Sequence, residues 1–150
     1  MKSLTIFLAT ACCVYSITPQ AKTDPVDNTK AYIVKMLDHQ DDLLTIGRAC
    51  TGLDSGIVQS VSCSVGKVSG TLSHILDLLL IYDSLDAAGK KKVLPFLLGN
   101  MEFFCKDLGL EIKSLSHNMA HAERKGLIHE ISEIRKDFRQ IRKDYKYPQE

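Results

Sequence analysis

Apolar residues recur every three or four positions along most of this chain, which is the spacing of buried helix faces. The longest row lies between residues 57 and 85, and its members are Val58, Val61, Val65, Val68, Leu72, Ile75, Leu79 and Tyr82. The full charges in the same segment are Lys67, Asp77 and Asp83. A helix with so few charges must be covered on more than one side, so we expect the other helices to pack around it.

The two halves of this central segment differ in composition. Residues 57–70 combine valines with serines and glycines, and each Gly costs about 1 kcal/mol relative to Ala in a helix. Part of this half, Val61–Val65, alternates with the period of a strand. The pattern therefore leaves open whether 57–70 is helical or irregular. Residues 72–85 are apolar on nearly all sides and predict the centre of the core.

Further amphipathic segments flank the central one. The first begins with Asp24 as an N-cap and Pro25 at the first helical position. We predict an all-α protein, an antiparallel four-helix bundle with helices at about 24–50, 56–85, 93–117 and 122–146. The residues expected to line the core, or an apolar ligand within it, are Leu72, Ile75, Leu79, Tyr82, Leu97, Met101, Phe104 and Leu108.

The first residues have the pattern of a secretory signal peptide. Lys2 supplies the positive start, and residues 4–15 form an apolar run that is too short to span a bilayer. A lipid-bearing Cys12 is the alternative. With cleavage after Ser16, the predicted organisation is a signal peptide at 1–16, a linker at 17–23, one helical domain at 24–147 and a tail at 148–150. The sequence therefore predicts a secreted, extracellular protein.

Removal of this leader leaves Cys50, Cys63 and Cys105, an odd number of cysteines in an oxidising compartment. One intramolecular disulfide is the simplest interpretation, and the leftover thiol could link two chains into a homodimer. A Cys50–Cys63 bridge needs the segment between them to loop. A Cys63–Cys105 bridge needs antiparallel second and third helices. The spacing leaves the pairing open.

Composition excludes one class of function and favours none. The formal net charge is +1, with 45% hydrophobic and 25% charged residues, ordinary values for a soluble globular protein. Such a chain lacks the basic footprint of a nucleic-acid-binding protein. Residues 66–70, Gly-Lys-Val-Ser-Gly, lack the frame of a phosphate-binding loop. We find no catalytic or nucleotide motif and predict a protein that is not an enzyme and uses no cofactor.

Two clusters of candidate metal ligands are better explained as ordinary surface residues. His117 and His121 are four residues apart and would share a helix face, but a zinc site normally needs three or four protein ligands. Asp38, Asp41 and Asp42 lack the spacing of an EF-hand loop. We expect no metal at either cluster and interpret the aspartates as a solvated helix face.

The remaining features favour an extracellular interaction protein that binds a receptor or another protein through an exposed helix face. The last helix, which is near the lysines at 90–92 in sequence, supplies the candidate face: Arg135, Lys136, Arg139, Arg142 and Lys143. The alternative is a carrier of lipid or another apolar ligand in the bundle core, and a membrane-inserting helical protein is the third hypothesis. A secreted bundle of this length is broadly similar to four-helix cytokines, although no motif assigns the chain to that family.

Overall fold

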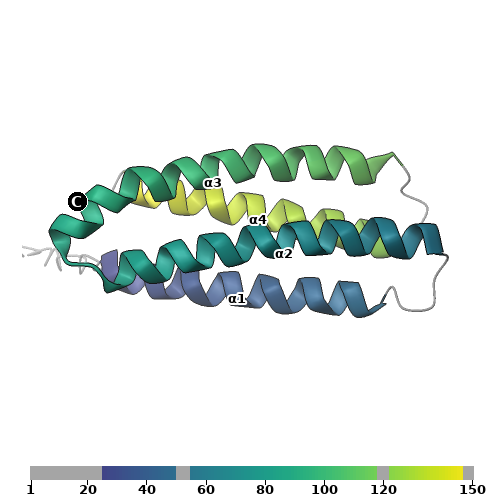
Figure 1. Ribbon diagram of the computed structural model, residues 1–150, viewed down its shortest axis with the longest axis horizontal. Coiled ribbons are helices and arrows are strands. Elements are labelled where there is room, and N and C mark those ends of the chain that lie inside the picture. Colours follow the sequence, from purple (N-terminus) through teal and green to yellow (C-terminus); the bar gives the residue numbers. More distant parts are fainter. Residues whose placement is uncertain (1–24, 50–54, 118–121, 147–150) are drawn as a thin grey trace, which may run out of the picture.

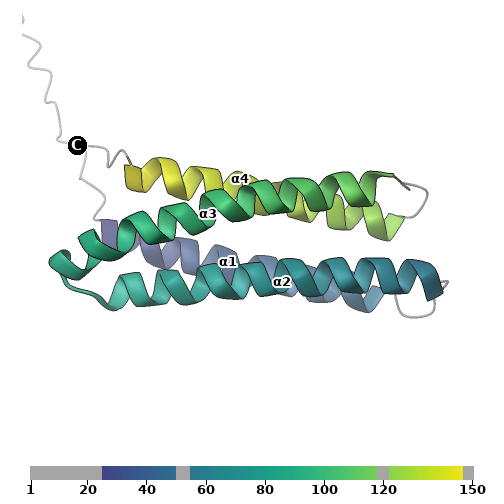
Figure 2. The same ribbon diagram turned by 45° about the horizontal axis from the view of Figure 1, so that its top comes forward.

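The computed structural model describes residues 25–49, 55–117 and 122–146, and within these ranges it contains four α-helices and no strand. The helices are α1 (Pro25–Ala49), α2 (Ser55–Ser84), α3 (Ala87–Ser116) and α4 (Ala122–Lys146). They lie lengthwise beside one another (Figure 1), and a turned view separates an α1–α2 pair from an α3–α4 pair (Figure 2). The predicted all-α class and helical bundle are confirmed. The predicted leader and linker, Cys50 and His121 lie outside the described residues.

The predicted start of the third helix at residue 93 is wrong. Asp86 has an extended backbone, and its Oδ1 accepts a hydrogen bond from the Gly89 N–H at 2.8 Å. This N-cap starts α3 at Ala87, because it satisfies one of the free N–H groups of the first turn. The basic run Lys90–Lys92 is therefore helical, and Pro95 lies inside α3.

The small-residue half of the central segment is helical, which answers the question that the sequence left open. Val61 and Val68 are fully buried there, so packing offsets the low helix propensity of the surrounding serines and glycines. Polar contacts to both neighbouring helices add to this. Gln40 of α1 donates to the Ser69 carbonyl at 2.9 Å, and the buried Ser64 donates to Glu111 of α3.

The hydrophobic core lies between the four helices along the length of the bundle. The predicted core residues that are buried in it are Leu72, Ile75, Leu79, Tyr82, Leu97, Met101 and Leu108. Phe104 is partly buried and packs against them. Among the described helices, Gly56–Ser84 alone is long and apolar enough to cross a membrane, with a window of mean hydropathy 1.2. A central core helix of a soluble bundle meets the same criteria.

Polar pairs align α1 with α4. They are Tyr32 with Asp144, Lys35 with Asp137, and His39 with Glu130. From the first of these pairs to the last, the residue number on α1 rises while the residue number on α4 falls. Among the described residues α1 contacts α2 and α4 but not α3, so α1 and α3 occupy opposite corners of the bundle.

Candidate protein-binding face on helix α3

Three large apolar side chains point away from the core along α3. Phe96, Phe103 and Leu110 are 59%, 64% and 62% exposed. Successive members are seven residues apart, about two helical turns, so they form a straight row. The fully buried Leu97 and Met101 face the other way, into the bundle. We call Phe96, Phe103 and Leu110 the outer α3 row.

The row is narrow, and small or polar residues fill the positions between its members. Gly99 lies between Phe96 and Phe103, and a Cβ added there would meet no atom within 4 Å. Lys106, between Phe103 and Leu110, has a side chain that is 75% exposed. A second helix could therefore approach α3 closely along this line, as in the seam of a coiled coil.

Sequence reasoning missed the outer α3 row because it followed only the buried seam through Leu97, Met101, Phe104 and Leu108. A signal was nevertheless present. Once the seam through Met101 and Leu108 is set aside, Phe96, Phe103 and Leu110 remain in heptad register on the opposite side. Two apolar rows on opposite sides of one helix predict that the helix has a neighbour on each side.

On the α2 side of the row, the acidic residues are already paired. Lys67 lies 3.3 Å from Asp107 and 3.0 Å from Glu111. Burial raises the pKa of Glu111, but the hydrogen bonds from Ser64 and Lys67 outweigh this, so that its pKa is lower than usual. Glu111 is thus ionised at neutral pH, and Lys67 forms an ion pair with each of the two carboxylates.

On the α4 side, Glu102 is paired in the same way. Its carboxylate lies 3.2 Å from Lys106 and 2.6 Å from Arg142. The hydrogen bond from Lys106, together with the charges of Arg142 and Lys106, lowers the pKa of Glu102. Lys92 and Lys113 are exposed, and their side chains have no hydrogen-bond or ion-pair partner among the described residues. The surroundings of the outer α3 row are therefore basic.

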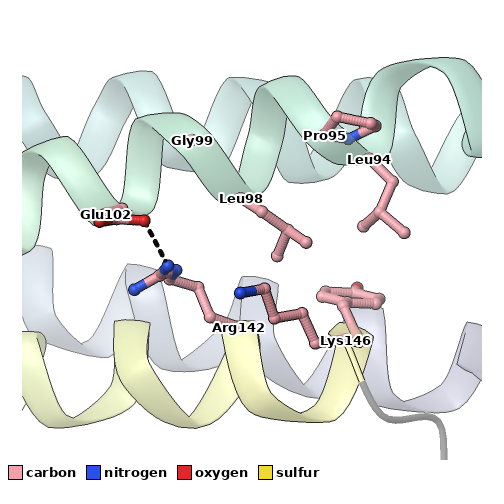
Figure 3. Close-up of a pocket in the computed structure, with 8 residues that line it drawn as sticks. Leu94, Pro95, Leu98, Gly99, Glu102, Arg142 and Lys146 are labelled. Atoms are coloured by element: carbon pink, nitrogen blue, oxygen red, sulfur yellow. Dashed lines mark hydrogen bonds and ion pairs between the residues drawn. The ribbon is translucent and has the colours of Figure 1, made fainter.

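A groove of about 450 Å³ lies next to the row, between α3 and α4 (Figure 3). It is lined by Leu94, Pro95, Leu98, Gly99, Glu102, Arg142, Tyr145 and Lys146. Figure 3 shows Leu94 and Leu98 pointing from α3 toward α4, with the Glu102–Arg142 ion pair beside them. Burial raises the pKa of Tyr145 to about 12, so its hydroxyl is neutral. The groove thus has apolar walls and a cationic rim.

The structure divides the predicted partner residues of the last helix into two groups. Arg135 and Arg142 are held by α3, since Arg135 Nε donates to the Cys105 carbonyl at 2.9 Å and Arg142 bonds to Glu102. Lys136, Arg139 and Lys143 are exposed. The α4 face remains a prediction, but two of its five members are tied into the bundle.

Among the described residues, Cys63 and Cys105 carry free thiols. Cys63 is exposed, whereas Cys105 is buried against α4, with its Sγ 3.7 Å from the Arg135 carbonyl. The Cys63–Cys105 bridge is therefore not formed. Burial raises the pKa of the Cys105 thiol, which opposes the thiolate that a nucleophilic cysteine needs. The proposed disulfide-linked homodimer remains a prediction.

The candidate histidine pair is only partly described. His117 is the C-cap of α3, and its Nδ1 lies 2.8 Å from the Lys113 carbonyl oxygen. In the part of the chain that the structure describes, no three His, Cys, Asp or Glu side chains gather in a way that could hold a metal ion.

No family model, curated protein or solved structure matches this chain. Its function is therefore inferred from the surface features described above.

Proposed function

We propose that this is a secreted, non-enzymatic helical-bundle protein that binds another protein through the outward face of α3. The observation that carries the proposal is the outer α3 row, in which Phe96, Phe103 and Leu110 are all more than half exposed in heptad register. Scattered apolar residues are normal on protein surfaces. A straight row of three large ones is the pattern of a helix that packs against a further element.

The row can supply a useful part of a binding energy. Complete burial of a large apolar side chain contributes about 1.5–3 kcal/mol. Because each member of the row is roughly 60% exposed, covering all three would contribute about 3–5 kcal/mol before the cost of association is subtracted. A contact centred on this row therefore needs further polar or apolar contacts to become tight.

Secretion is supported by the sequence pattern of the leader, with Lys2 before an apolar run at residues 4–15. The proposal also includes antiparallel neighbouring helices. The order of the polar pairs between α1 and α4 supports this, because Lys35 meets Asp137 while His39, further along α1, meets Glu130.

The test compares protein retained from the natural secretion by immobilised wild-type chain and by the Phe103→Gln variant. Phe103→Gln removes an exposed ring without adding charge and loses the edge contact with Phe104, so the free energy of unfolding should fall by only about 0.5–1.5 kcal/mol. Binding should weaken by about 10-fold, the equivalent of 1.4 kcal/mol. Ile81→Gln is the matched control, since Ile81 is a 49% exposed apolar residue on α2. Equal retention by wild type and Phe103→Gln would rule out the α3 face.

The groove between α3 and α4 favours a second candidate, a carrier of an apolar ligand with an anionic end. Leu94, Leu98 and Tyr145 would contact the apolar part, and Lys146 at the rim would meet the anion. Native mass spectrometry of the secreted protein tests this. A co-purifying lipid that is lost in a Leu98→Gln variant supports the carrier, whereas a bare polypeptide mass argues against it.

A further inference from the structure

Basic side chains gather on one side of α4. They include Arg135, Arg139, Arg142 and Lys146. Steps of four, three and four residues place these four on a single helix face. Burial raises the pKa of the Cys105 thiol of α3, and the positive charges of Arg139, Arg135 and Arg142 oppose this rise. The basic face of α4 is therefore turned toward α3.

The described acidic residues of α4 lie on other sides of the helix or are already paired. They are Glu130, Glu133, Asp137 and Asp144. Glu130 and Asp137 lie beside His39 of α1, and Asp144 accepts a hydrogen bond from the same helix. Glu133 forms an ion pair with Lys136 at 2.9 Å. The charges of α4 are thus sorted by side, with acids toward α1 and bases toward α3.

Two lysines of α3 extend this basic surface. The side chain of Lys106 is 75% exposed and lies 3.2 Å from Glu102, which Arg142 of α4 also contacts. Lys106 therefore lies at the boundary between α3 and α4. Lys113 is exposed seven residues further on, about two helical turns, and so it lies on the same side of α3.

Together these residues carry an excess of positive charge. We call the following set the basic band: Lys106, Lys113, Arg135, Arg139, Arg142, Lys143 and Lys146. Among the described residues, Glu102 is the carboxylate that forms ion pairs with the band, through Lys106 and Arg142. The exposed members that form no ion pair with another described residue are Lys113, Arg139, Lys143 and Lys146. Their charges are available to an anionic partner.

An apolar groove opens within the basic band. Leu94 and Leu98 line it together with Arg142 and Lys146, and Figure 3 shows both leucines pointing from α3 toward α4 beside these cations. A partner that matches this surface carries anions over an apolar layer. An anionic lipid bilayer has this arrangement, because charged headgroups cover its acyl chains. A soluble polyanion has no apolar part to place against the leucines.

We propose that the basic band docks this protein on the surface of an anionic lipid bilayer. The inference goes beyond the proposed function and does not rest on it, because no member of the outer α3 row belongs to the band. Helices α3 and α4 lie lengthwise beside one another (Figure 1), so both can lie along the plane of a membrane. The bundle stays folded in this contact, and α2 stays in the core rather than crossing the bilayer.

Binding should depend on lipid charge and on salt. Each Lys or Arg near an anionic membrane surface strengthens binding by about 5-fold, the equivalent of about 1 kcal/mol. At about 1 M salt, charges are screened beyond about 3 Å. High salt should therefore release the protein from the vesicles, whereas a helix inserted across the bilayer would stay bound.

Co-sedimentation of the chain, purified after secretion, with lipid vesicles tests the proposal. Wild type should bind phosphatidylcholine vesicles that contain phosphatidylserine at least about 10-fold more tightly than vesicles of phosphatidylcholine alone. The triple variant Arg139→Gln, Lys143→Gln and Lys146→Gln should bind the anionic vesicles about 100-fold more weakly than wild type. Circular dichroism checks that the helices are retained, as expected for exposed residues without ion pairs.

A pair of single substitutions provides a matched control. Lys143→Gln should weaken binding to the anionic vesicles by about 5-fold. Lys30→Gln removes an exposed lysine of α1 that forms no ion pair with another described residue, and it changes the net charge by the same amount. Lys30→Gln should leave binding within about two-fold of wild type. Equal losses in the two variants would show that binding follows net charge alone and would exclude the band.

Other results would also overturn the proposal. Equal binding to the two kinds of vesicle, or full binding by the triple variant, excludes the band as a lipid-binding surface. Binding that survives about 1 M salt excludes peripheral docking. Retention on immobilised heparin without vesicle binding assigns the band to a soluble polyanion instead. A wild type that binds no vesicle but still loses a captured protein on Phe103→Gln excludes the bilayer and leaves the proposed function intact.

Discussion

The stability of this bundle should fall as the pH rises above neutrality, because a histidine links α1 to α4. His39 Nδ1 lies 2.5 Å from Glu130 and its Nε2 lies 3.2 Å from Asp137. The three side chains are 12%, 10% and 16% exposed. Burial lowers the pKa of His39, but hydrogen bonds to Glu130 and Asp137 outweigh it, so the pKa is raised above its ordinary 6.5. Lys35, 3.0 Å from Asp137, is the other cation nearby.

The sign follows from the direction of this pKa shift. A folded-state pKa above the unfolded value of 6.5 means that the protonated imidazole stabilises the fold fully below about pH 6.5. That contribution is lost as pH rises through the folded-state pKa. Hydrogen bonds to a charged group contribute about 1.5–3 kcal/mol each. Because the cluster is partly solvated, we expect His39→Gln to lower the free energy of unfolding by about 2–3 kcal/mol near pH 6.

Urea unfolding of wild type and His39→Gln from about pH 6 to 9 measures the effect. The difference between the two proteins should shrink with rising pH, because the neutral glutamine does not titrate and neutral histidine can donate only one hydrogen bond. If the difference in free energy of unfolding between wild type and His39→Gln stays constant over this pH range, the reasoning is refuted. A pKa of His39 at or below 6.5, measured by NMR of the folded protein, would contradict it independently.

Further predictions concern the packing of α2 and α3. Leu79→Ala should lower the free energy of unfolding by about 2.7–5 kcal/mol, because Leu79 is fully buried in the core; a loss below 1 kcal/mol in thermal unfolding would contradict this. Gly70→Ala should raise it by about 0.8–1 kcal/mol, or about 2–4 °C in Tm, since a Cβ there meets no atom within 4 Å. Gly109→Ala should raise the free energy of unfolding by less than Gly70→Ala does, or lower it, because the added Cβ would come within 2.9 Å of Arg135 Nη2 and displace the guanidinium that bonds to the Cys105 carbonyl. Equal increases in the free energy of unfolding at both glycines would exclude this clash.

Local periodicity was sufficient to predict the elements of the fold. Leu72, Ile75 and Leu79 repeat at helical spacing in a segment with few charges. A helix of this kind is stable only when other helices surround it. Its burial follows from the sequence alone. The start of α3 was missed for a local reason. Pro95 resembled the start of a helix and the lysines at 90–92 resembled a loop, whereas the Asp86 cap lies further upstream.

Contacts between distant helices could not be predicted in this way. His39 and Glu130 are 91 residues apart, and their pairing depends on the rotation of two helices about their axes. The rotation of α4 about its axis also places Arg142 beside Glu102 of α3 and leaves Lys143, the next residue of α4, exposed. Sequence spacing gives the side of a helix on which a residue lies, but it does not give the partner that this side meets.

Folding alone accounts for one of the two apolar sides of α3 but not for the other. Leu97, Met101 and Leu108 are fully buried, so each contributes to the stability of the bundle. Phe103 contacts the ring of Phe104 at 5.4 Å between centroids, a pair that contributes about 0.5–1.5 kcal/mol, yet it remains 64% exposed. A polar residue in its place would leave the core intact. The apolar surface of the outer α3 row becomes stabilising only when another surface covers it, and the basic side chains around the row favour an acidic one.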